Sequence, residues 1–471
     1  MKKLFSILLI AVFALSLAGC GNNNDNPDDP VDPGDDPVCT NNAANGTLYE
    51  FDKNQTEITT IKVWLDDEAY ATALIDAFEA TYPDIKVEWE HVGAVDTRQR
   101  LETYSGSSYA ADVVVFPHDH IGAALNSNLL YPFPNDMRQD LVTSMVGSAI
   151  ETATSCYDTE NNTAVECVEG GNYESELFGA PLSGESIALF YNKTLLEEIT
   201  GSAEPQGTWE EIIETAMTYN QLDDPETTEV DESRLYFALD VDDAYVAHFI
   251  ATSFGFELFG SDHLDKTLVN LDSDEMINAL TWMNETMRPA TNNYTAAGLD
   301  GGTINALFES GELPYIVSGP WSISSYLEAS EINEFEFGVV QLPTINGVQP
   351  TSFSGVQIAA VYKGTQEPTA AFKFVEFMTS DEGLAIMYAQ TNKLPALKDV
   401  STVAGVASDP YLSGISAQLA YSHPMPIIAE MGYFWSNAGS MYASAWNGTA
   451  TPTEAAETAQ DGFEAQANLT E

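Results

Sequence analysis

Cationic side chains are scarce in this sequence of 471 residues, which has 16 Lys and Arg residues against 72 Asp and Glu residues. Proteins that bind nucleic acid need clustered Lys and Arg to neutralise phosphates, so the formal net charge of -56 argues against such a partner. It also disfavours an anionic solute, although one well-placed Arg would suffice for that. The hydrophobic fraction of 44% is ordinary for a globular protein, and we expect a folded chain of about two to three domains.

Long apolar runs are missing after the first twenty residues. Lys2 and Lys3 precede an apolar stretch that ends in Leu17-Ala18-Gly19-Cys20, the layout of a secretory signal, and this ending resembles a bacterial lipobox. We expect residues 1–19 to be a lipoprotein signal peptide, Cys20 to carry lipid, and residues 20–55, rich in Asp and Pro, to be a disordered acidic linker. An uncleaved anchor is the alternative, but the run is shorter than the ~20 residues of a spanning helix.

Cysteine is also rare, with four residues in the chain. Cys156 and Cys167 bracket a polar, turn-like segment, and in an exported protein they are plausible disulfide partners that close a small hairpin. Cys39 lies in the linker and has no obvious partner in the sequence.

Common catalytic signatures are absent: the sequence contains no Gly-x-Ser-x-Gly, no His-Glu-x-x-His, no phosphate-binding loop motif and no Gly-x-Gly-x-x-Gly. His118-Asp119-His120 is the one local cluster with metal-ligand residue types, and further ligands would have to come from elsewhere. We interpret it as a loop at the end of a strand, and we expect no metal and no cofactor.

Apolar patterns predict alternating strands and helices. Residues 61–65, 85–89 and 111–116 have strand patterns, and residues 70–78 and 98–104 between them have helical spacing. Further strands are predicted at 187–191, 235–239, 315–317, 337–340 and 356–362, and a helix is predicted to open at Thr208. This order indicates an α/β fold with mostly parallel sheets flanked by helices.

Polar and aromatic residues lie near several of these strands. Open α/β sheets bind ligands beyond the carboxyl ends of their strands, and Asp119 directly follows the strand at 111–116. Glu185, Asp243, Tyr245 and Trp321 lie near other strands, and Trp435 lies in a late helical region. Carboxylates accept hydrogen bonds from hydroxyl groups and aromatic faces cover C–H surfaces, so the set suits a polyhydroxylated, uncharged ligand. Taken singly, each is a weak signal, because core packing is the more common role of a Trp or Tyr, and a solvated surface is the more common place for any one of 72 Asp and Glu residues.

Several segments together carry a resemblance to a known family. They are Val63-Trp64-Leu65 with Asp66-Asp67-Glu68, the run Asp112 to Asp119, Tyr191-Asn192-Lys193, Thr208-Trp209-Glu210-Glu211, Ser318-Gly319-Pro320-Trp321, Thr379-Ser380-Asp381-Glu382-Gly383 and Met431-Gly432-Tyr433-Phe434-Trp435. In order and spacing the chain resembles the extracellular solute-binding proteins of carbohydrate ABC importers, in particular the maltose/maltodextrin-binding group.

The resemblance implies a two-lobed, type II binding-protein fold with a hinged cleft between the lobes. Residues 56–183 with 358–405 would form lobe one, and residues 188–353 with 410–471 would form lobe two. The ligand-binding residues that it implies are Asp67, Phe116, Asp119, Glu185, Asp243, Tyr245, Trp321 and Trp435, with Phe116 at a position where the family often has Trp.

The sequence departs from the family at three positions. His120 and Gly439 stand where better-known members have Arg, and Val246 replaces an aromatic residue. These changes leave a sugar as the expected ligand but put maltose itself in doubt. Met425 falls in a stretch that lines the cleft in the family, and core packing is the alternative for it.

The expected function is that of a lipid-anchored, monomeric binding protein on the outer face of a bacterial cell membrane. It would bind a maltodextrin-type oligosaccharide and deliver it to the permease subunits of an ABC importer without catalysing a reaction. The alternatives are another oligosaccharide or neutral solute, or a surface glycosidase, which needs two carboxylates about 5–10 Å apart. The acidic surface is expected to be halophilic, because salt screens the repulsion among its charges.

Overall fold

The computed structural model describes residues 59–158, 163–164, 174–221, 234–261 and 263–469. The predicted signal peptide, the linker with Cys20 and Cys39, and Cys167 lie outside the described residues. Within the described part, no helix is both long enough and apolar enough to cross a membrane.

The first part of the chain forms parallel strands joined by helices, as predicted. Strands β1 (Thr59–Leu65), β2 (Ile85–His91) and β3 (Val113–Pro117) pair in parallel, with α2 (Glu68–Thr81) and α3 (Ala94–Tyr104) between them. Every residue of β3 is buried, as expected for an apolar strand covered on both faces. Helix α2 begins at Asp67, whose side chain accepts a hydrogen bond from the backbone N–H of Tyr70.

Two long strands complete this larger sheet. β7 (Ala180–Ser186) and β12 (Ser352–Val361) pair antiparallel with each other, and β12 also pairs antiparallel with β3. β13 (Leu394–Pro395) joins β7, β14 (Ser422–Pro424) joins β12, and the order is β13-β7-β12-β3-β1-β2. The predicted mostly parallel pairing therefore holds for β1–β3 and for the short β12–β14 pair, whereas β7 and β12 cross between two halves of the molecule in opposite directions and pair antiparallel.

A second sheet has the order β11-β8-β10-β9 and contains β8 (Ala188–Asn192), β9 (Phe237–Ala238), β10 (Tyr315–Ser318) and β11 (Phe337–Val340). β8 pairs antiparallel with both β10 and β11, and only the β9–β10 pair in this described sheet is parallel. The strands predicted at 187–191, 235–239, 315–317 and 337–340 are thus confirmed. Thr208 caps its helix as predicted, by accepting a hydrogen bond from the N–H of Glu211.

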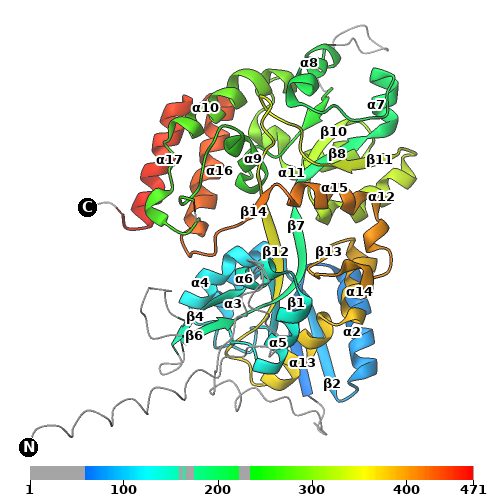
Figure 1. Cartoon of the computed structure of the whole chain (residues 1–471), viewed down its shortest axis with the longest axis vertical. Helices are drawn as coiled ribbons and strands as arrows, with labels where there is room; N and C mark the ends of the chain where they lie inside the picture. Colours follow the sequence, from blue (N-terminus) through cyan, green and yellow to red (C-terminus); the bar gives the residue numbers. More distant parts are fainter. Residues whose placement is uncertain (1–58, 159–162, 165–173, 222–233, 262, 470–471) are drawn as a thin grey trace, which may run out of the picture.

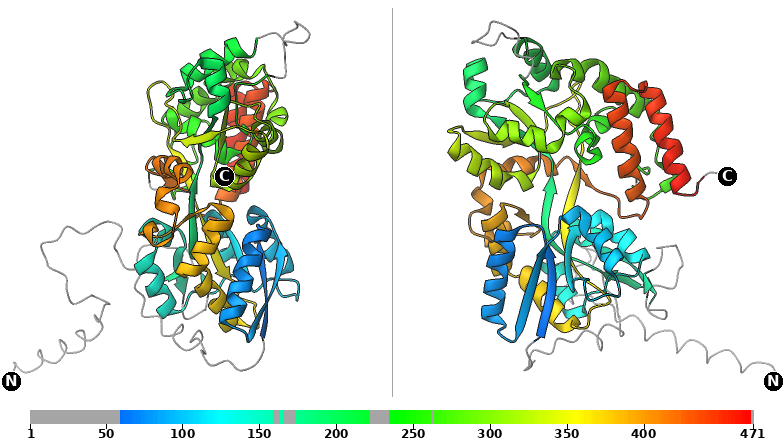
Figure 2. Two further views of the ribbon diagram at one scale, coloured as in Figure 1. Left: turned by 90° about the vertical axis from the view of Figure 1, so that its right-hand side faces the viewer. Right: turned by 180° about the vertical axis from the view of Figure 1, so that it is seen from behind.

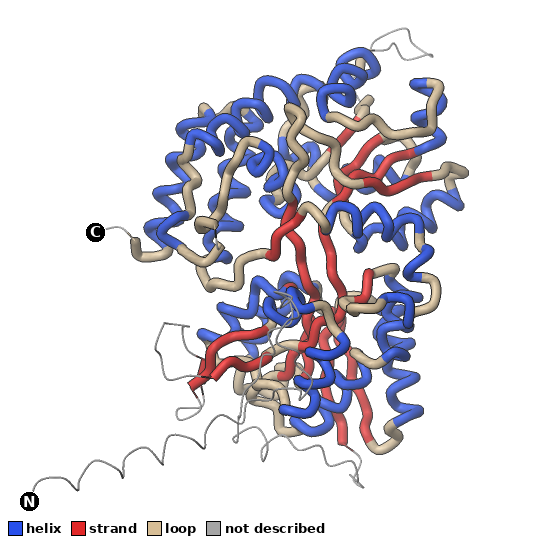
Figure 3. Tube along the Cα trace, viewed as in Figure 1, coloured by secondary structure: helices blue, strands red, loops and turns tan. Residues whose placement is uncertain are grey.

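Helices surround both sheets (Figure 3). The larger sheet is accompanied by α4 (Ile121–Asn126), α5 (Asn135–Ser144), α6 (Gly147–Thr152), α13 (Pro368–Met378) and α14 (Asp381–Thr391). The second sheet is accompanied by α7 (Lys193–Thr200), α8 (Trp209–Tyr219), α9 (Ala244–Ser253), α10 (Asp274–Trp282), α11 (Gly301–Glu309), α12 (Ile323–Ile332), α15 (Pro410–Leu419), α16 (Met431–Asn447) and α17 (Pro452–Gln466).

The elements form two lobes, one above the other in Figure 1. The lobe of the larger sheet, lobe one, contains the N-terminal strands, and lobe two contains the second sheet with α16 and α17. β7 and β12 run from one lobe to the other, as the view from behind in Figure 2 shows. The two-lobed α/β fold is therefore as predicted, and the carboxyl ends of β1 and β3 point toward the junction of the lobes.

A small sheet carries the predicted hairpin. β4 (Thr154–Asp158) pairs antiparallel with β5 (Thr163–Ala164) and with β6 (Glu174–Leu177). Cys156, on β4, is disulfide-bonded. Since Cys167 is outside the described residues, its pairing with Cys156 stays a prediction.

Candidate functional site

A cavity of about 590 Å³ lies at the junction of the lobes. Its lining residues come from both lobes and are Asp66, Ala94, Val95, Pro117, Asp119, His120, Glu185, Asp243, Tyr245, Trp321, Gln357, Lys393, Met425 and Trp435. Most of the predicted site residues are in this set, namely Asp119, Glu185, Asp243, Tyr245, Trp321 and Trp435. The structure thus brings together residues that are more than 300 positions apart in the chain.

Two predicted residues, Asp67 and Phe116, are not among those that line the cavity. The side chain of Asp67 is occupied as the cap of α2, and Asp66, one residue closer to the end of β1, lines the cavity instead. Two rules could have found this: ligands lie just beyond strand ends, and an Asp directly before a helix is a typical cap. Phe116 is fully buried in β3, and its ring stacks on His120, whose centroid lies 6.3 Å away. The lining residue at this point is therefore His120.

Asp119 connects the two walls of the cavity. The side chain is buried, and its Oδ2 accepts a hydrogen bond of 2.9 Å from Nε1 of Trp435 in α16. Its Oδ1 is buried and has no hydrogen-bond partner among the described residues. His120 Nε2 lies 4.0 Å from Asp119 Oδ2, and burial lowers the pKa of His120, which favours the neutral imidazole.

The floor of the cavity is formed by the crossing strands. Gln357 on β12 donates a 2.9 Å hydrogen bond from Nε2 to Oε1 of Glu185 on β7, and both residues are buried. Gln357 Oε1 is a second buried acceptor without a partner in the described part of the chain. Burial raises the pKa of Glu185, and the nearby Lys393 opposes this rise. Lys393 Nζ also lies 3.4 Å from Asp66 Oδ2, so the lining cation is paired with a lining carboxylate.

Aromatic rings form the lobe-two wall. The ring centroid of Tyr245 lies 6.1 Å from that of Trp321 and 6.5 Å from that of Trp435, and Tyr245 stacks on Phe353 at 6.0 Å. Asp243 holds Tyr245 in place, because its Oδ1 caps α9 by accepting a 2.8 Å hydrogen bond from the Tyr245 N–H. Phe353 was not predicted as part of the site, because a strand pattern does not show which ring will pack behind a residue that lines the cavity.

Trp321 presents the most accessible ring of this wall, with 43% of its surface exposed. The indole lies over the backbone of Gly319, where an added Cβ would fall 2.2 Å from the ring. Glycine is therefore required at position 319 for the ring to lie in this place. An exposed indole held against backbone is suited to stacking on a flat, apolar ligand face.

The departures from the family pattern have simple structural explanations. Val246 is buried, so the position at which the family has an aromatic ring belongs to the core of this protein. Gly439 lies in α16, where an added Cβ would come within 2.7 Å of the carbonyl oxygen of Asp242, so the packing leaves no space for a longer side chain. Both interpretations of Met425, cavity lining and core packing, hold, because the residue lines the cavity and is only 4% exposed.

His118 does not line the cavity and serves a different purpose. It is fully buried, with Nε2 at 2.9 Å from the carbonyl oxygen of Met425, while Nδ1 accepts a 3.0 Å hydrogen bond from the N–H of Val356. Both ring nitrogens are thus engaged by backbone groups. Among the residues that the structure describes, no three His, Cys, Asp or Glu side chains are placed to hold a metal ion.

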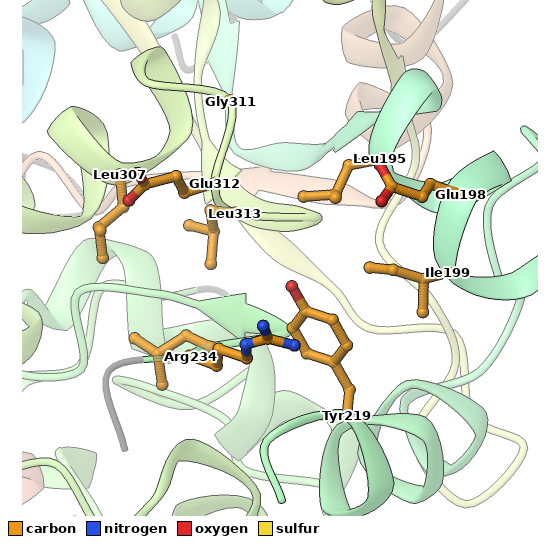
Figure 4. A pocket seen from close by; sticks show the side chains of 10 residues that line it. Leu195, Glu198, Ile199, Tyr219, Arg234, Leu307, Gly311, Glu312 and Leu313 are labelled. Atoms are coloured by element: carbon orange, nitrogen blue, oxygen red, sulfur yellow. The ribbon is translucent and has the colours of Figure 1, made fainter. Parts of the chain in front are cut away.

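A second cavity of about 590 Å³ lies in lobe two (Figure 4). It is lined by Leu195, Glu198, Ile199, Tyr219, Arg234, Leu235, Leu307, Gly311, Glu312 and Leu313, and it shares none of these with the interlobe cavity. Arg234 lies over the ring of Tyr219, at 5.7 Å from its centroid. Since the two cavities have the same volume, their chemistry distinguishes them. Of these two, the interlobe cavity alone combines several carboxylates with a group of aromatic rings, and its lining residues come from both lobes.

Comparisons with known proteins agree with this geometry. A maltotriose-binding protein of Pyrococcus abyssi is 27% identical over 369 residues, covering 77% of this chain and 71% of the relative. A galactooligosaccharide-binding protein of Bacillus subtilis is 22% identical and covers 99% of this chain and 97% of the relative. The crystal structure of MalX from Streptococcus pneumoniae in complex with maltopentaose has a TM-score of 0.71 at 20% identity, covering 86% of this chain and all of that one.

The family match spans most of the chain. Residues 73–413 match the family described as bacterial extracellular solute-binding protein. The family is one of binding proteins, as are the relatives from Pyrococcus abyssi and Bacillus subtilis, and on that ground the prediction that the chain is not an enzyme is confirmed. The chain belongs to the bacterial extracellular solute-binding protein family.

Proposed function

We propose that this protein captures a neutral oligosaccharide of the maltodextrin type in the interlobe cavity and delivers it to the permease of an ABC importer. In this proposal residues 56–183 with 358–405 and residues 188–353 with 410–471 move as two lobes about the crossing segments. The contacts to sugar come from Asp66, Asp119, Glu185, Asp243, Tyr245, Trp321 and Trp435.

The observation that carries the proposal is the pairing of unsatisfied acceptors with aromatic rings in one cavity. Asp119 Oδ1 and Gln357 Oε1 are buried without partners in the described residues, a costly state that a ligand hydroxyl relieves by donating a hydrogen bond. Tyr245, Trp321 and Trp435 supply rings for the C–H face of a sugar on the opposite wall. A pyranose chain meets both requirements, because it donates hydrogen bonds from its hydroxyl groups and presents a flat C–H face.

The relatives support maltodextrin in particular. One is the maltotriose-binding protein of Pyrococcus abyssi, and another is a maltooligosaccharide ABC transporter solute-binding lipoprotein of Streptococcus pneumoniae, 22% identical over 400 residues and covering 84% of this chain and 86% of the relative. A galacto-oligosaccharide is the second candidate, favoured by the relative from Bacillus subtilis that covers almost the whole chain. Both candidates are neutral, as the acidic lining requires.

Isothermal titration calorimetry with maltotriose, a β-galacto-oligosaccharide and an oligogalacturonide separates these possibilities. We expect maltotriose to bind, the galacto-oligosaccharide to bind more weakly and the anionic oligogalacturonide not to bind. Binding of the galacto-oligosaccharide alone would establish the second candidate, and binding of none of the three would overturn oligosaccharide capture.

We further propose that the protein is held at the cell membrane by lipid on Cys20, with residues 20–55 as the tether. The support is the lipobox-like ending of the N-terminal segment together with the relative from Streptococcus pneumoniae that is named a lipoprotein. Metabolic labelling with a fatty acid analogue tests it. The wild-type protein should incorporate the label, and a Cys20→Ala variant that is labelled equally would contradict the proposal.

A further inference from the structure

Three of the six histidines of the chain meet at the lobe-two end of β12, behind the wall of aromatic rings. His248 lies in α9, His423 in β14 and His263 in a loop, and none of these three residues lines the cavity. The rings of His263 and His423 stack with their centroids 4.3 Å apart, and Nε2 of His248 lies 3.4 Å from Nε2 of His423. We call these three residues the histidine cluster.

One arrangement of protons fits the contacts of His423 and His248. Burial lowers the pKa of His423 to about 4 and lowers that of His248 well below its usual value, so both rings are neutral at pH 7. Nδ1 of His423 lies 3.2 Å from the carbonyl oxygen of Pro424, which can only accept, so Nδ1 carries the hydrogen of this ring. Nε2 of His423 is then an acceptor, and His248 donates to it from Nε2.

The ring of His248 packs against Phe353, which is fully buried in β12 and lies behind the cavity wall. The two centroids are 3.8 Å apart, at an interplanar angle of 12°. Phe353 in turn contacts two rings of the wall, because it stacks on Tyr245 at 6.0 Å and meets Trp435 edge-on at 5.4 Å. The Tyr245 hydroxyl also donates a 3.5 Å hydrogen bond to the carbonyl oxygen of Phe353. The histidine cluster therefore reaches the cavity wall through Phe353.

We propose that His248 is a positioning residue for the aromatic wall: His423 fixes its ring, and its ring fixes Phe353. The inference rests on the function proposed above, because this wall is the one assigned to sugar. In the other tautomer of His248 a lone pair on Nε2 would face the lone pair of His423, and their hydrogen bond would be lost. Nδ1 of His248 is buried without a partner in the described residues, so the bond to His423 is the one that orients this ring.

His263 adds a second contact to His423. Its backbone φ of 57° lies in the left-handed region, which residues other than glycine seldom adopt. Its Nδ1 lies 2.9 Å from the carbonyl oxygen of Leu258, and its ring is parallel to that of His423 within 9°. An unusual backbone conformation is maintained only where the surrounding contacts determine it, and here it places a flat ring on His423.

Two substitutions of His423 isolate its hydrogen bond to His248. Both remove the imidazole that stacks on His263, but His423→Gln can place a carbonyl oxygen near the position of Nε2, whereas His423→Leu presents no polar atom. The buried N–H of His248 is thus left without an acceptor in the Leu variant alone. His91→Leu is the control, since His91 is exposed at the end of β2 and does not line the cavity.

Fluorine NMR of the full chain containing 3-fluorotyrosine reports on the ring of Tyr245 without any ligand. Its signal is identified by its absence in Tyr245→Phe. We expect this signal to shift in His423→Leu and to stay close to that of the wild-type protein in His423→Gln and His91→Leu. A folded His423→Leu variant with an unchanged Tyr245 signal would overturn the positioning role.

Nitrogen NMR of wild-type protein with labelled histidine tests the tautomer and does not require any variant to fold. The signals of His248 are assigned through the contact of its ring with Phe353. At pH 7 we expect a neutral ring with its hydrogen on Nε2. A hydrogen on Nδ1 of His248 would contradict the bond to His423 and with it the proposal.

Titration calorimetry with maltotriose connects the histidine cluster to the sugar. The dissociation constant should rise about fivefold in His423→Leu, as for the loss of one hydrogen bond, and by less in His423→Gln. If the wild-type protein binds maltotriose and a folded His423→Leu variant binds it equally well, the positioning role fails and the proposed function stands. If the wild-type protein does not bind, the maltodextrin assignment fails, and the fluorine and nitrogen spectra still decide the role of His248.

Discussion

Removing the indole of Trp321 is the most direct test of the aromatic wall. The ring lines the cavity and is 43% exposed, so it has surface left for a ligand to cover. Fully burying an aromatic side chain removes about 150–250 Å² from water, so the exposed 43% corresponds to about 65–110 Å². At about 25 cal/mol per Å², covering that area contributes about 1.6–2.7 kcal/mol, and its loss weakens binding about 15- to 100-fold.

The assay is calorimetric titration of Trp321→Ala with the tightest-binding oligosaccharide, after a thermal melt has shown that the variant is folded. Tyr433→Ala is the control, because Tyr433 is 40% exposed on α16 but does not line the cavity. We expect the dissociation constant to rise for Trp321→Ala alone. If a folded Trp321→Ala variant binds within twofold of the wild-type protein, the ring is not a platform for sugar and the assignment of this wall fails.

Three other predictions use simpler measurements. Trp435→Phe keeps a ring but removes the N–H that binds Asp119, so the dissociation constant should rise about tenfold, and in a double-mutant cycle with Asp119→Asn the two effects should not add. Burial lowers the pKa of His423 to about 4 and also lowers that of His248. The unfolded chain, with a His pKa of about 6.5, then binds more protons at these two positions, so the histidines contribute a fall in the free energy of unfolding as the pH drops from about 6.5 to 4. Asp240, whose pKa burial raises to about 7, acts in the opposite direction, so the test is a difference between variants: in urea titrations the free energy of unfolding of the wild-type protein, relative to that of His423→Gln, should fall with the pH. The melting temperature should rise between low and molar salt, and a flat response would remove the halophilic interpretation of the acidic surface.

Local patterns in the sequence predicted the strands that are short apolar runs, but they missed β4, β5, β6, β13, β14 and the crossing strand β7, whose Pro, Ser, Gly and Glu residues interrupt the apolar pattern. They also placed Asp119, Asp243 and Tyr245 near the site, since residues close to strand ends converge in this type of fold. Asp67 shows the limit of this reasoning. Two adjacent carboxylates follow β1, and the sequence alone does not decide that Asp66 lines the cavity while Asp67 caps α2.

Contacts between distant segments could not be predicted in this way. Lys393 reaches Asp66 from 327 positions away, and His118 reaches Met425 from 307 positions away. Gln357 lies in a strand that was predicted correctly, but its bond to Glu185 depends on the register of β12 against β7. Such contacts follow from how the chain crosses between the lobes, which no local periodicity encodes.

The carboxylates that line the cavity are paired or buried, unlike the surface carboxylates that make up most of the net charge of the chain. Of the lining carboxylates, Asp66 is paired with Lys393, Asp243 is used to cap α9, and burial raises the pKa of Glu185, which favours its neutral form. Asp119 differs from these three in that its second oxygen is buried and has no hydrogen-bond partner among the described residues. Rejection of anionic sugars should therefore depend mainly on Asp119, and it should persist in molar salt, because a buried charge is screened far less than the surface carboxylates that make up most of the net charge of -56.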